Sequence, residues 1–183
     1  MNSNNNIPLV EETNQWAIIH VSEVTPRNIN ALIKNLKLPL SENFYISFNS
    51  LIKLGKKARK NLQFEIKNIV KSDWRKYLFE ILLENASERP HNLYPLVSHL
   101  YYPDFVKRAQ AINVASENNL GADYFDIILP LLDDPDDSVR WAALNYLISK
   151  DKVNMMIVQG KLNERREMEQ NKTILCKIDS LID

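Results

Sequence analysis

The sequence has few of the residues from which reactive sites are commonly built. It contains one cysteine, three histidines and three glycines among 183 residues. The single cysteine, Cys176, cannot form an internal disulfide, and its apolar neighbours indicate a small core residue rather than a nucleophile. No glycine-rich loop precedes a helix, and no serine lies in a nucleophile elbow, so neither a phosphate-cradling loop nor a serine hydrolase is expected.

The histidines do not form a metal-binding pattern. His20, His91 and His99 have no second histidine, cysteine or acidic residue at a ligand spacing. A zinc site would need further ligands from distant segments of the chain. We therefore expect a protein without catalytic residues, a bound metal or a cofactor.

Long apolar runs are also missing. Charged residues interrupt the apolar segments well before the ~20 residues that a membrane-spanning helix needs. The first six residues are polar and uncharged, so the chain has no signal-peptide pattern. These features predict a cytoplasmic protein that does not bind a membrane, and its length is enough for one domain with a substantial core.

Apolar residues recur at helical spacing along most of the chain. Pro26 is a good first helical residue, because its missing amide proton would have no helical partner. Ser41 can cap a following helix, which is either one long helix or two with a hinge near Asn61. Residues 16–21 fit a strand or a short helix, and we prefer the helix because a lone strand would have no partner.

The most informative stretch is an acidic, proline-bearing turn between two helical segments. Residues 131–144 read LLDDPDDSVRWAAL. Moving back 32 residues from Arg140 leads to Arg108. Five neighbouring positions also agree, and they pair Pro135 with Pro103, Asp136 with Asp104, Ala143 with Ala111, Leu144 with Ile112 and Asn145 with Asn113. A further 33 residues lead to Arg75, where the match is one of character more than identity. A period of about 33 residues is typical of one helix–turn–helix unit.

The turn, the Val-Arg pair and the alanines that follow it resemble the hinge of a HEAT-like repeat. This resemblance implies an all-α fold, a short alpha–alpha superhelix of HEAT-like helical hairpins. Repeat units stabilise one another by stacking. We expect helices near residues 73–86, 92–101, 104–118, 123–132 and 138–149, stacked as antiparallel pairs, with a bend at Pro130.

The resemblance also suggests how the chain is divided. We predict a disordered amino terminus (residues 1–8), a helical amino-terminal part (9–72), and HEAT-like repeats with a carboxyl-terminal capping helix (73–183). The stretch 161–172 carries charges of both signs and few apolar residues, as a terminal repeat that meets water would.

In HEAT repeats the arginine of the Val-Arg pair commonly bonds a turn aspartate, and the resulting ladder ties neighbouring units together. Asp134 is placed for this role relative to Arg140. The equivalent positions before Arg108 and Arg75 hold Tyr102 and Ile69, so the ladder is expected to be partial. An arginine without a carboxylate would be free to face a partner.

Arginines and aromatic residues near the repeated turns are the candidate binding residues, because both types are enriched at interface hot spots. Trp74 also lies beside an arginine, but its clean apolar face favours packing. The candidates are Trp141, Arg140, Arg108, Lys107, Arg75, Tyr101 and Tyr102.

Charge is balanced overall, with 23 basic and 23 acidic residues, but unevenly distributed. Five residues between Lys53 and Lys60 are basic and none is acidic, and Lys67, Lys71 and Lys76 extend this stretch. This stretch fits either a phosphate-binding stripe or the solvated face of a surface helix. We prefer the solvated face, because the apolar residues between the charges keep helical spacing. The acidic residues 133–137 lack the central glycine of a calcium loop, and we interpret them as a turn with negative charge before a helix.

We therefore expect a non-catalytic protein–protein interaction module, an adaptor or an immunity-type inhibitor, that binds another protein on its helical surface. The alternative is a nucleic-acid-binding protein that resembles alkylpurine DNA glycosylases, which use Trp, Asp and Arg on a basic concave face. Trp141 and Arg140 are compatible with that role, whereas the neutral charge and the acidic turn argue against it. Pigment lyases with similar repeats are a third class, which would need a ligand pocket.

Overall fold

The computed structural model describes residues 26–70, 73–87, 96–118, 120, 122–149 and 155–182. The sequence-based interpretations of residues 1–8, residues 16–21 and Lys71 fall outside these ranges. Within them the chain is all-α, as predicted, and has no strand.

The helices lie close to the predicted positions. They are α1 (Pro26–Asn35), α2 (Glu42–Leu54), α3 (Arg59–Ile66), α4 (Arg75–Asn85), α5 (Val97–Leu100), α6 (Phe105–Glu117), α7 (Ala122–Ile128), α8 (Asp137–Ile148), α9 (Met155–Arg166) and α10 (Lys172–Ile182), with 3-10 turns η2 (Gly55–Ala58) and η3 (Leu129–Asp133). None of the described helices has the length and apolar content needed to cross a membrane.

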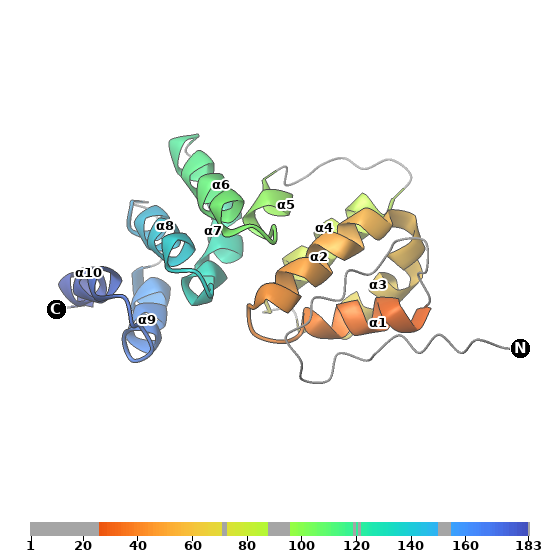
Figure 1. The fold of residues 1–183 in the computed structure, drawn as a ribbon, viewed down its shortest axis with the longest axis horizontal. Coiled ribbons are helices and arrows are strands. Elements are labelled where there is room, and N and C mark those ends of the chain that lie inside the picture. The colour runs from red at the N-terminus through yellow and green to blue at the C-terminus, as the bar shows by residue number, and fades with distance from the viewer. Residues whose placement is uncertain are drawn as a thin grey trace, which may run out of the picture.

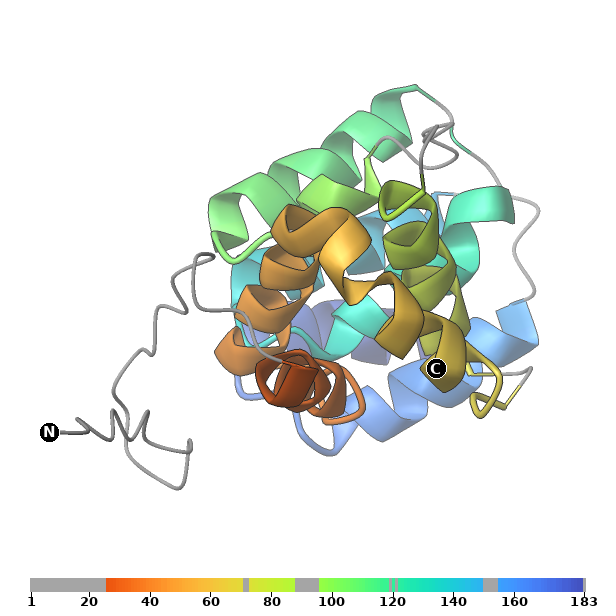
Figure 2. The same ribbon diagram turned by 90° about the vertical axis from the view of Figure 1, so that its right-hand side faces the viewer.

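The helices are arranged along one long axis. Figure 1 shows α1–α4 grouped at one end, with α6, α8 and α10 succeeding one another toward the other end. In Figure 2, seen along that axis, the amino-terminal helices lie in front of the rest of the molecule. Helix α6 packs against α8, and α9 packs against α10.

Short polar side chains start three of the longer helices, as their sequence positions suggest. Ser41 accepts a hydrogen bond from the Phe44 amide at the start of α2, at 3.3 Å. Asp104 and Asp136 do the same for α6 and α8. The acidic residues before α8 form a turn with negative charge at the start of the helix, as predicted, and Asp136 also caps it.

The structure corrects one expected hinge. The helix that begins at Glu42 breaks at Gly55 rather than near Asn61, because Gly55 adopts a φ of +49° that favours glycine. Asn61 lies inside α3, where its side chain donates to Asn30 at 2.7 Å. Near Pro130 the chain leaves α-geometry, and the predicted helix 123–132 becomes α7 followed by the 3-10 turn η3.

An aromatic cluster joins the amino-terminal helices to the rest of the core. It consists of Phe44, Tyr45, Phe48, Trp74 and Tyr101. Trp74 and Tyr101 stack with ring centroids 5.8 Å apart, so Trp74 packs as its sequence context predicted. The cluster links α2 to the chain segments on either side of α4 and α5, and thereby anchors α1–α4 against the helices that follow.

Candidate functional site

Arg108, on the first turns of α6, lies at the centre of a buried polar network. Its Nε and Nη2 atoms each donate to one carboxylate oxygen of Asp134, both at 2.8 Å. Its Nη1 atom donates to the carbonyl oxygens of Tyr102 and Pro103, at 2.9 and 2.8 Å. Only 3% of the Arg108 side chain and none of the Asp134 side chain is exposed. Such a two-bond pair fixes orientation as well as distance.

Tyr45, from helix α2, contacts both members of this ion pair. Its hydroxyl donates to Asp134 Oδ2 at 2.5 Å, and its ring centroid lies 3.9 Å from the guanidinium carbon of Arg108. Burial of the phenol, followed by the nearby Asp134 carboxylate, raises the pKa of Tyr45 far above its ordinary value. Tyr45 therefore stays protonated and remains a donor, so helix α2 is tied to both partners of the ion pair.

Arg140 repeats the geometry of Arg108 one unit later. Its Nε and Nη2 atoms donate to the two carboxylate oxygens of Glu169, at 2.9 and 2.8 Å. Its Nη1 atom donates to the carbonyl oxygens of Asp134 and Pro135, at 2.9 and 3.1 Å. Each arginine thus bonds the carbonyls six and five residues before it and the carboxylate of a later turn.

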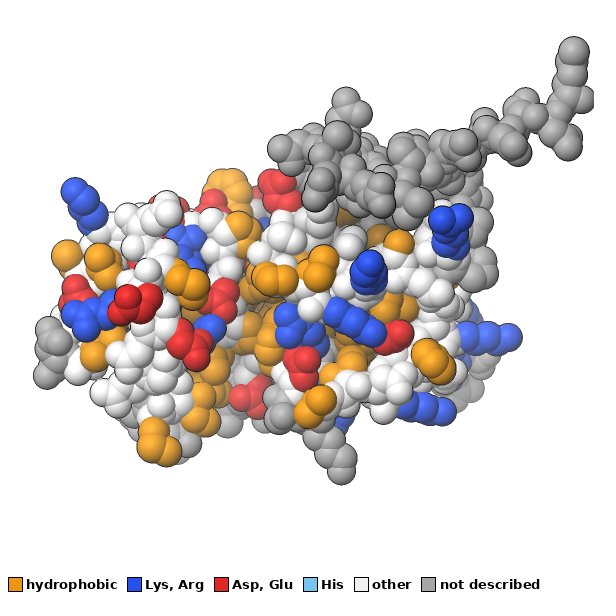
Figure 3. Space-filling view, turned by 90° about the horizontal axis from the view of Figure 1, so that it is seen from below, with side chains coloured by type: hydrophobic (Ala, Val, Ile, Leu, Met, Phe, Trp, Pro, Cys, Tyr) orange, Lys and Arg blue, Asp and Glu red, His pale blue; other side chains and the backbone are white. Residues whose placement is uncertain are grey.

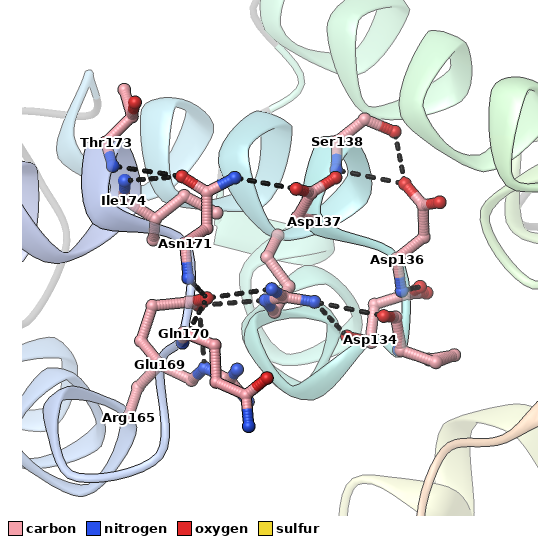
Figure 4. Close-up of polar contacts among 12 residues, drawn as sticks. Asp134, Asp136, Asp137, Ser138, Arg165, Glu169, Gln170, Asn171, Thr173 and Ile174 are labelled. Atoms are coloured by element: carbon pink, nitrogen blue, oxygen red, sulfur yellow. Dashed lines mark hydrogen bonds and ion pairs between the residues drawn. The ribbon is translucent and has the colours of Figure 1, made fainter.

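Glu169 is the most densely bonded carboxylate of the network. Its oxygens also accept from the amides of Gln170 and Asn171, at 3.0 and 2.9 Å, and from Arg165 Nε at 3.0 Å. Burial alone would raise the pKa of Glu169, but the hydrogen bonds from Arg140, Asn171 and Arg165 outweigh it and lower the pKa to about 2. Figure 4 shows Glu169 in the turn between α9 and α10, with Arg165 and the amides of Gln170 and Asn171 directed at its carboxylate.

The predicted pairing of Asp134 with Arg140 needs correction. The Asp134 carboxylate pairs with Arg108 of the preceding unit, and only its main-chain oxygen accepts from Arg140. The carboxylate of Asp134 also accepts from the amide of Asp136, which turns it away from Arg140. Glu169 was not predicted, because the charges around it indicated a solvated surface.

Arg75 takes no part in this network. Its Nε and Nη2 atoms donate to the carbonyl oxygens of Leu36 and Leu38, at 3.0 and 3.1 Å. Its guanidinium also lies 4.8 Å from the Trp74 ring centroid and 3.4 Å from Asp73. Arg75 therefore holds the segment between α1 and α2, and its donors are largely occupied.

Burial separates the predicted binding residues into two groups. Arg108, Arg140 and Tyr101 are buried, and the Tyr101 hydroxyl donates to the Ile127 carbonyl oxygen at 2.7 Å. The prediction that these three side chains meet a partner directly is therefore not supported by their positions. Trp141 and Lys107 are exposed and Tyr102 is half-buried, with Lys107 Nζ 4.2 Å from the centre of the Tyr102 ring.

A face of apolar and amide side chains crosses the neighbouring helices α6 and α8, and the exposed Asp137 lies beside it, four residues before Trp141. We call it the α6–α8 surface. Its residues recur at helical spacing on each helix, and all are exposed or half-buried: Phe105, Ala109 and Asn113 on α6, and Trp141, Asn145 and Ile148 on α8. Phe105 is 45% exposed and Trp141 37%, although both are large apolar side chains.

No protein-family model, characterised protein or solved structure matches this chain. Within the described ranges, no group of three or more His, Cys, Asp or Glu side chains is placed to hold a metal ion. We therefore base the proposed function on the α6–α8 surface, whose two helices are held in place by the buried network.

The buried network makes a measurable contribution to folding. Asp134→Asn leaves Arg108 with an uncompensated buried charge, so it should lower the free energy of unfolding by about 3–5 kcal/mol. Tyr45→Phe removes one hydrogen bond to a charged group and keeps the ring, so its cost should be about 1.5–3 kcal/mol. Urea denaturation measures both. A loss below 1 kcal/mol for Asp134→Asn would contradict the assigned pairing.

Stability should also fall in acid because of Glu169. Its pKa is about 2 in the folded protein against an ordinary value of 4.5, so its contribution is complete above the ordinary value and is lost as the pH drops from about 5 to about 2. Glu169→Gln should lower stability at neutral pH and flatten the acid dependence. The exposed neighbour Glu167→Gln is the control. Equal acid dependence in the Glu169 and Glu167 variants would contradict the assignment.

Proposed function

We propose that this protein is a HEAT-like helical-repeat adaptor that binds another protein on the α6–α8 surface and has no catalytic activity of its own. The repeat interpretation is supported by Arg108 and Arg140, which lie 32 residues apart and make the same two carbonyl bonds and one bidentate carboxylate pair. The cytoplasmic location expected from the sequence stays a prediction.

The observation that carries the proposal is the exposure of Trp141 and Phe105 on neighbouring helices, among apolar and amide side chains. The central part of a protein interface is depleted in charged residues and enriched in aromatic ones. Tryptophan is also among the residues that contribute most to binding energy. A partner with an apolar side chain of its own would bury both rings.

Two asparagines add polar groups of the kind that a peptide partner needs. Asn113 and Asn145 lie at equivalent positions of α6 and α8, and neither side chain has a hydrogen-bond partner in the described part of the chain. A carboxamide both donates and accepts hydrogen bonds, so each can pair with a peptide group of the partner. We infer a partner segment that combines an apolar anchor with an accessible backbone.

The buried network favours binding by keeping the surface rigid. Arg108 and Arg140 are fixed by bidentate pairs on the inward sides of α6 and α8. A surface that is already ordered before binding loses less conformational entropy on association. Trp141 directly follows Arg140 in the chain, so its backbone position is set by this pair.

A nucleic-acid role of the kind found in alkylpurine DNA glycosylases has less support on this face. It would use exposed cations, but Arg108 and Arg140 are buried and paired. None of the six residues of the α6–α8 surface is basic. Phosphate binding depends mainly on exposed Lys and Arg, so this face suits a protein better.

The proposal is tested by site-specific crosslinking followed by affinity measurement. A photo-reactive amino acid at Asn113 or Asn145 should crosslink one protein partner in cells that express the chain, whereas the same group at the exposed Asn163 of α9 should not. Trp141→Ala should then weaken binding of the identified partner by about 2 kcal/mol or more. Phe64→Ala, which changes an exposed aromatic of α3, is the matched control. Unchanged affinity for Trp141→Ala would refute the proposal.

A further inference from the structure

The amino-terminal helices carry an excess of positive charge that the balanced total conceals. Residues 26–70 contain nine basic and two acidic side chains, whereas residues 96–182 contain ten basic and thirteen acidic ones. In Figure 3, Lys and Arg side chains are spread over the half of the molecule formed by α1–α4, where acidic side chains are few. The electrostatic potential is therefore positive around the amino-terminal end and negative around the carboxyl-terminal end, so the two ends attract different partners.

The positive charge is concentrated on the outward face of η2 and α3. The opposite face of this segment is buried in the core through Ala58 and Leu62. The residues turned away from the core form what we call the η2–α3 basic surface: Lys56, Lys57, Lys60, Phe64 and Lys67, all of them exposed. Lys53 and Arg59, also exposed, flank it.

No acidic side chain among the described residues neutralises the charges on this surface. Within the described residues none of its four lysines takes part in an ion pair. The one acidic residue of α3, Glu65, pairs with Lys37 at 2.5 Å instead. The lysines are therefore available to an anionic partner.

Phe64 lies in the middle of these lysines with 68% of its surface exposed. It falls four residues after Lys60 and three before Lys67, so helical spacing places all three on one face. An aromatic ring that stands in water among cations contributes little to the core. Proteins that bind single-stranded nucleic acid combine these two elements, with cations along the backbone and aromatic rings on which bases stack.

We propose that the η2–α3 basic surface binds single-stranded nucleic acid, with its lysines on successive phosphates and an unpaired base stacked on Phe64. This site is independent of the α6–α8 surface. An anionic membrane fits less well, because Phe64 is the one apolar residue of the surface and an interfacial helix needs a broad apolar face. An acidic protein also fits less well, since lysine is depleted at protein interfaces.

The test uses the full chain and a fluorescent 12-nucleotide oligothymidylate, titrated at two salt concentrations. If four or five phosphates are contacted, raising the salt from 50 to 200 mM should weaken binding about 50- to 130-fold. The triple variant Lys56→Gln, Lys57→Gln, Lys60→Gln should bind weakly and show a flatter salt dependence. Lys172→Gln with Lys177→Gln, at the far end of the molecule, should leave both quantities unchanged.

Phe64→Ala separates base stacking from general electrostatic attraction. It should weaken binding about tenfold, while the salt dependence remains, because the phosphate contacts are intact. A hairpin duplex should bind more weakly than the single strand, and vesicles of phosphatidylserine should not compete. Trp141→Ala should have no effect on the oligonucleotide.

Three results would overturn the proposal. They are no binding of the oligonucleotide at 50 mM salt, equal affinity of wild type and Phe64→Ala, or tighter binding of the vesicles than of the oligonucleotide. Circular dichroism of each variant shows whether a loss of binding comes from unfolding. Phe64→Ala is the more secure variant in this respect, because it removes a largely exposed side chain.

Discussion

The ion pair between Arg108 and Asp134 is the interaction on which the rest of the structure depends. It joins α6 to the turn before α8, and Tyr45 adds α2 through its hydroxyl and its ring. Burying two charges is costly, and only excellent geometry with further hydrogen bonds offsets that cost. Here the arginine donates four bonds and the aspartate accepts from three groups. We infer that the pair sets the relative positions of these elements.

Apolar spacing predicted the all-α fold and most helix positions, because amphipathic helices leave a local pattern in the sequence. The acidic turn before α8 was predicted from its own aspartates and proline, but the cap by Asp136 was not. The partner of Asp134 was not, because the distance between Arg108 and Asp134 in the chain says nothing of which turn faces which helix. Glu169 and Tyr45 were missed on similar grounds, and Tyr101 was expected at the surface although it lies in the core. Acidic residues do follow Arg108 and Arg140 by 26 and 29 positions, but Asp104 follows Arg75 by 29 positions and does not pair with it, so chain spacing alone does not identify the two carboxylates.

The two proposed binding surfaces differ in chemistry and in place. The α6–α8 surface carries aromatic, aliphatic and amide side chains. The buried network holds its two helices in place. The η2–α3 basic surface lies on the amino-terminal helices, beyond the glycine break at Gly55. The chain is neutral overall because acidic residues elsewhere offset the basic excess of residues 26–70, and its two surfaces suit two different kinds of partner. An adaptor that brings a protein to a single-stranded nucleic acid would have this distribution.

The central claim is that one ion pair holds α2, α6 and α8 in a fixed relation. Amide hydrogen exchange in the wild type and in Asp134→Asn tests it most directly, because exchange reports the opening of each helix separately. The account predicts that amides of α2, α6 and α8 lose protection together in the variant, whereas those of α10, which follows the Arg140–Glu169 pair, keep most of theirs. Loss of protection confined to the turn around Asp134 would contradict it.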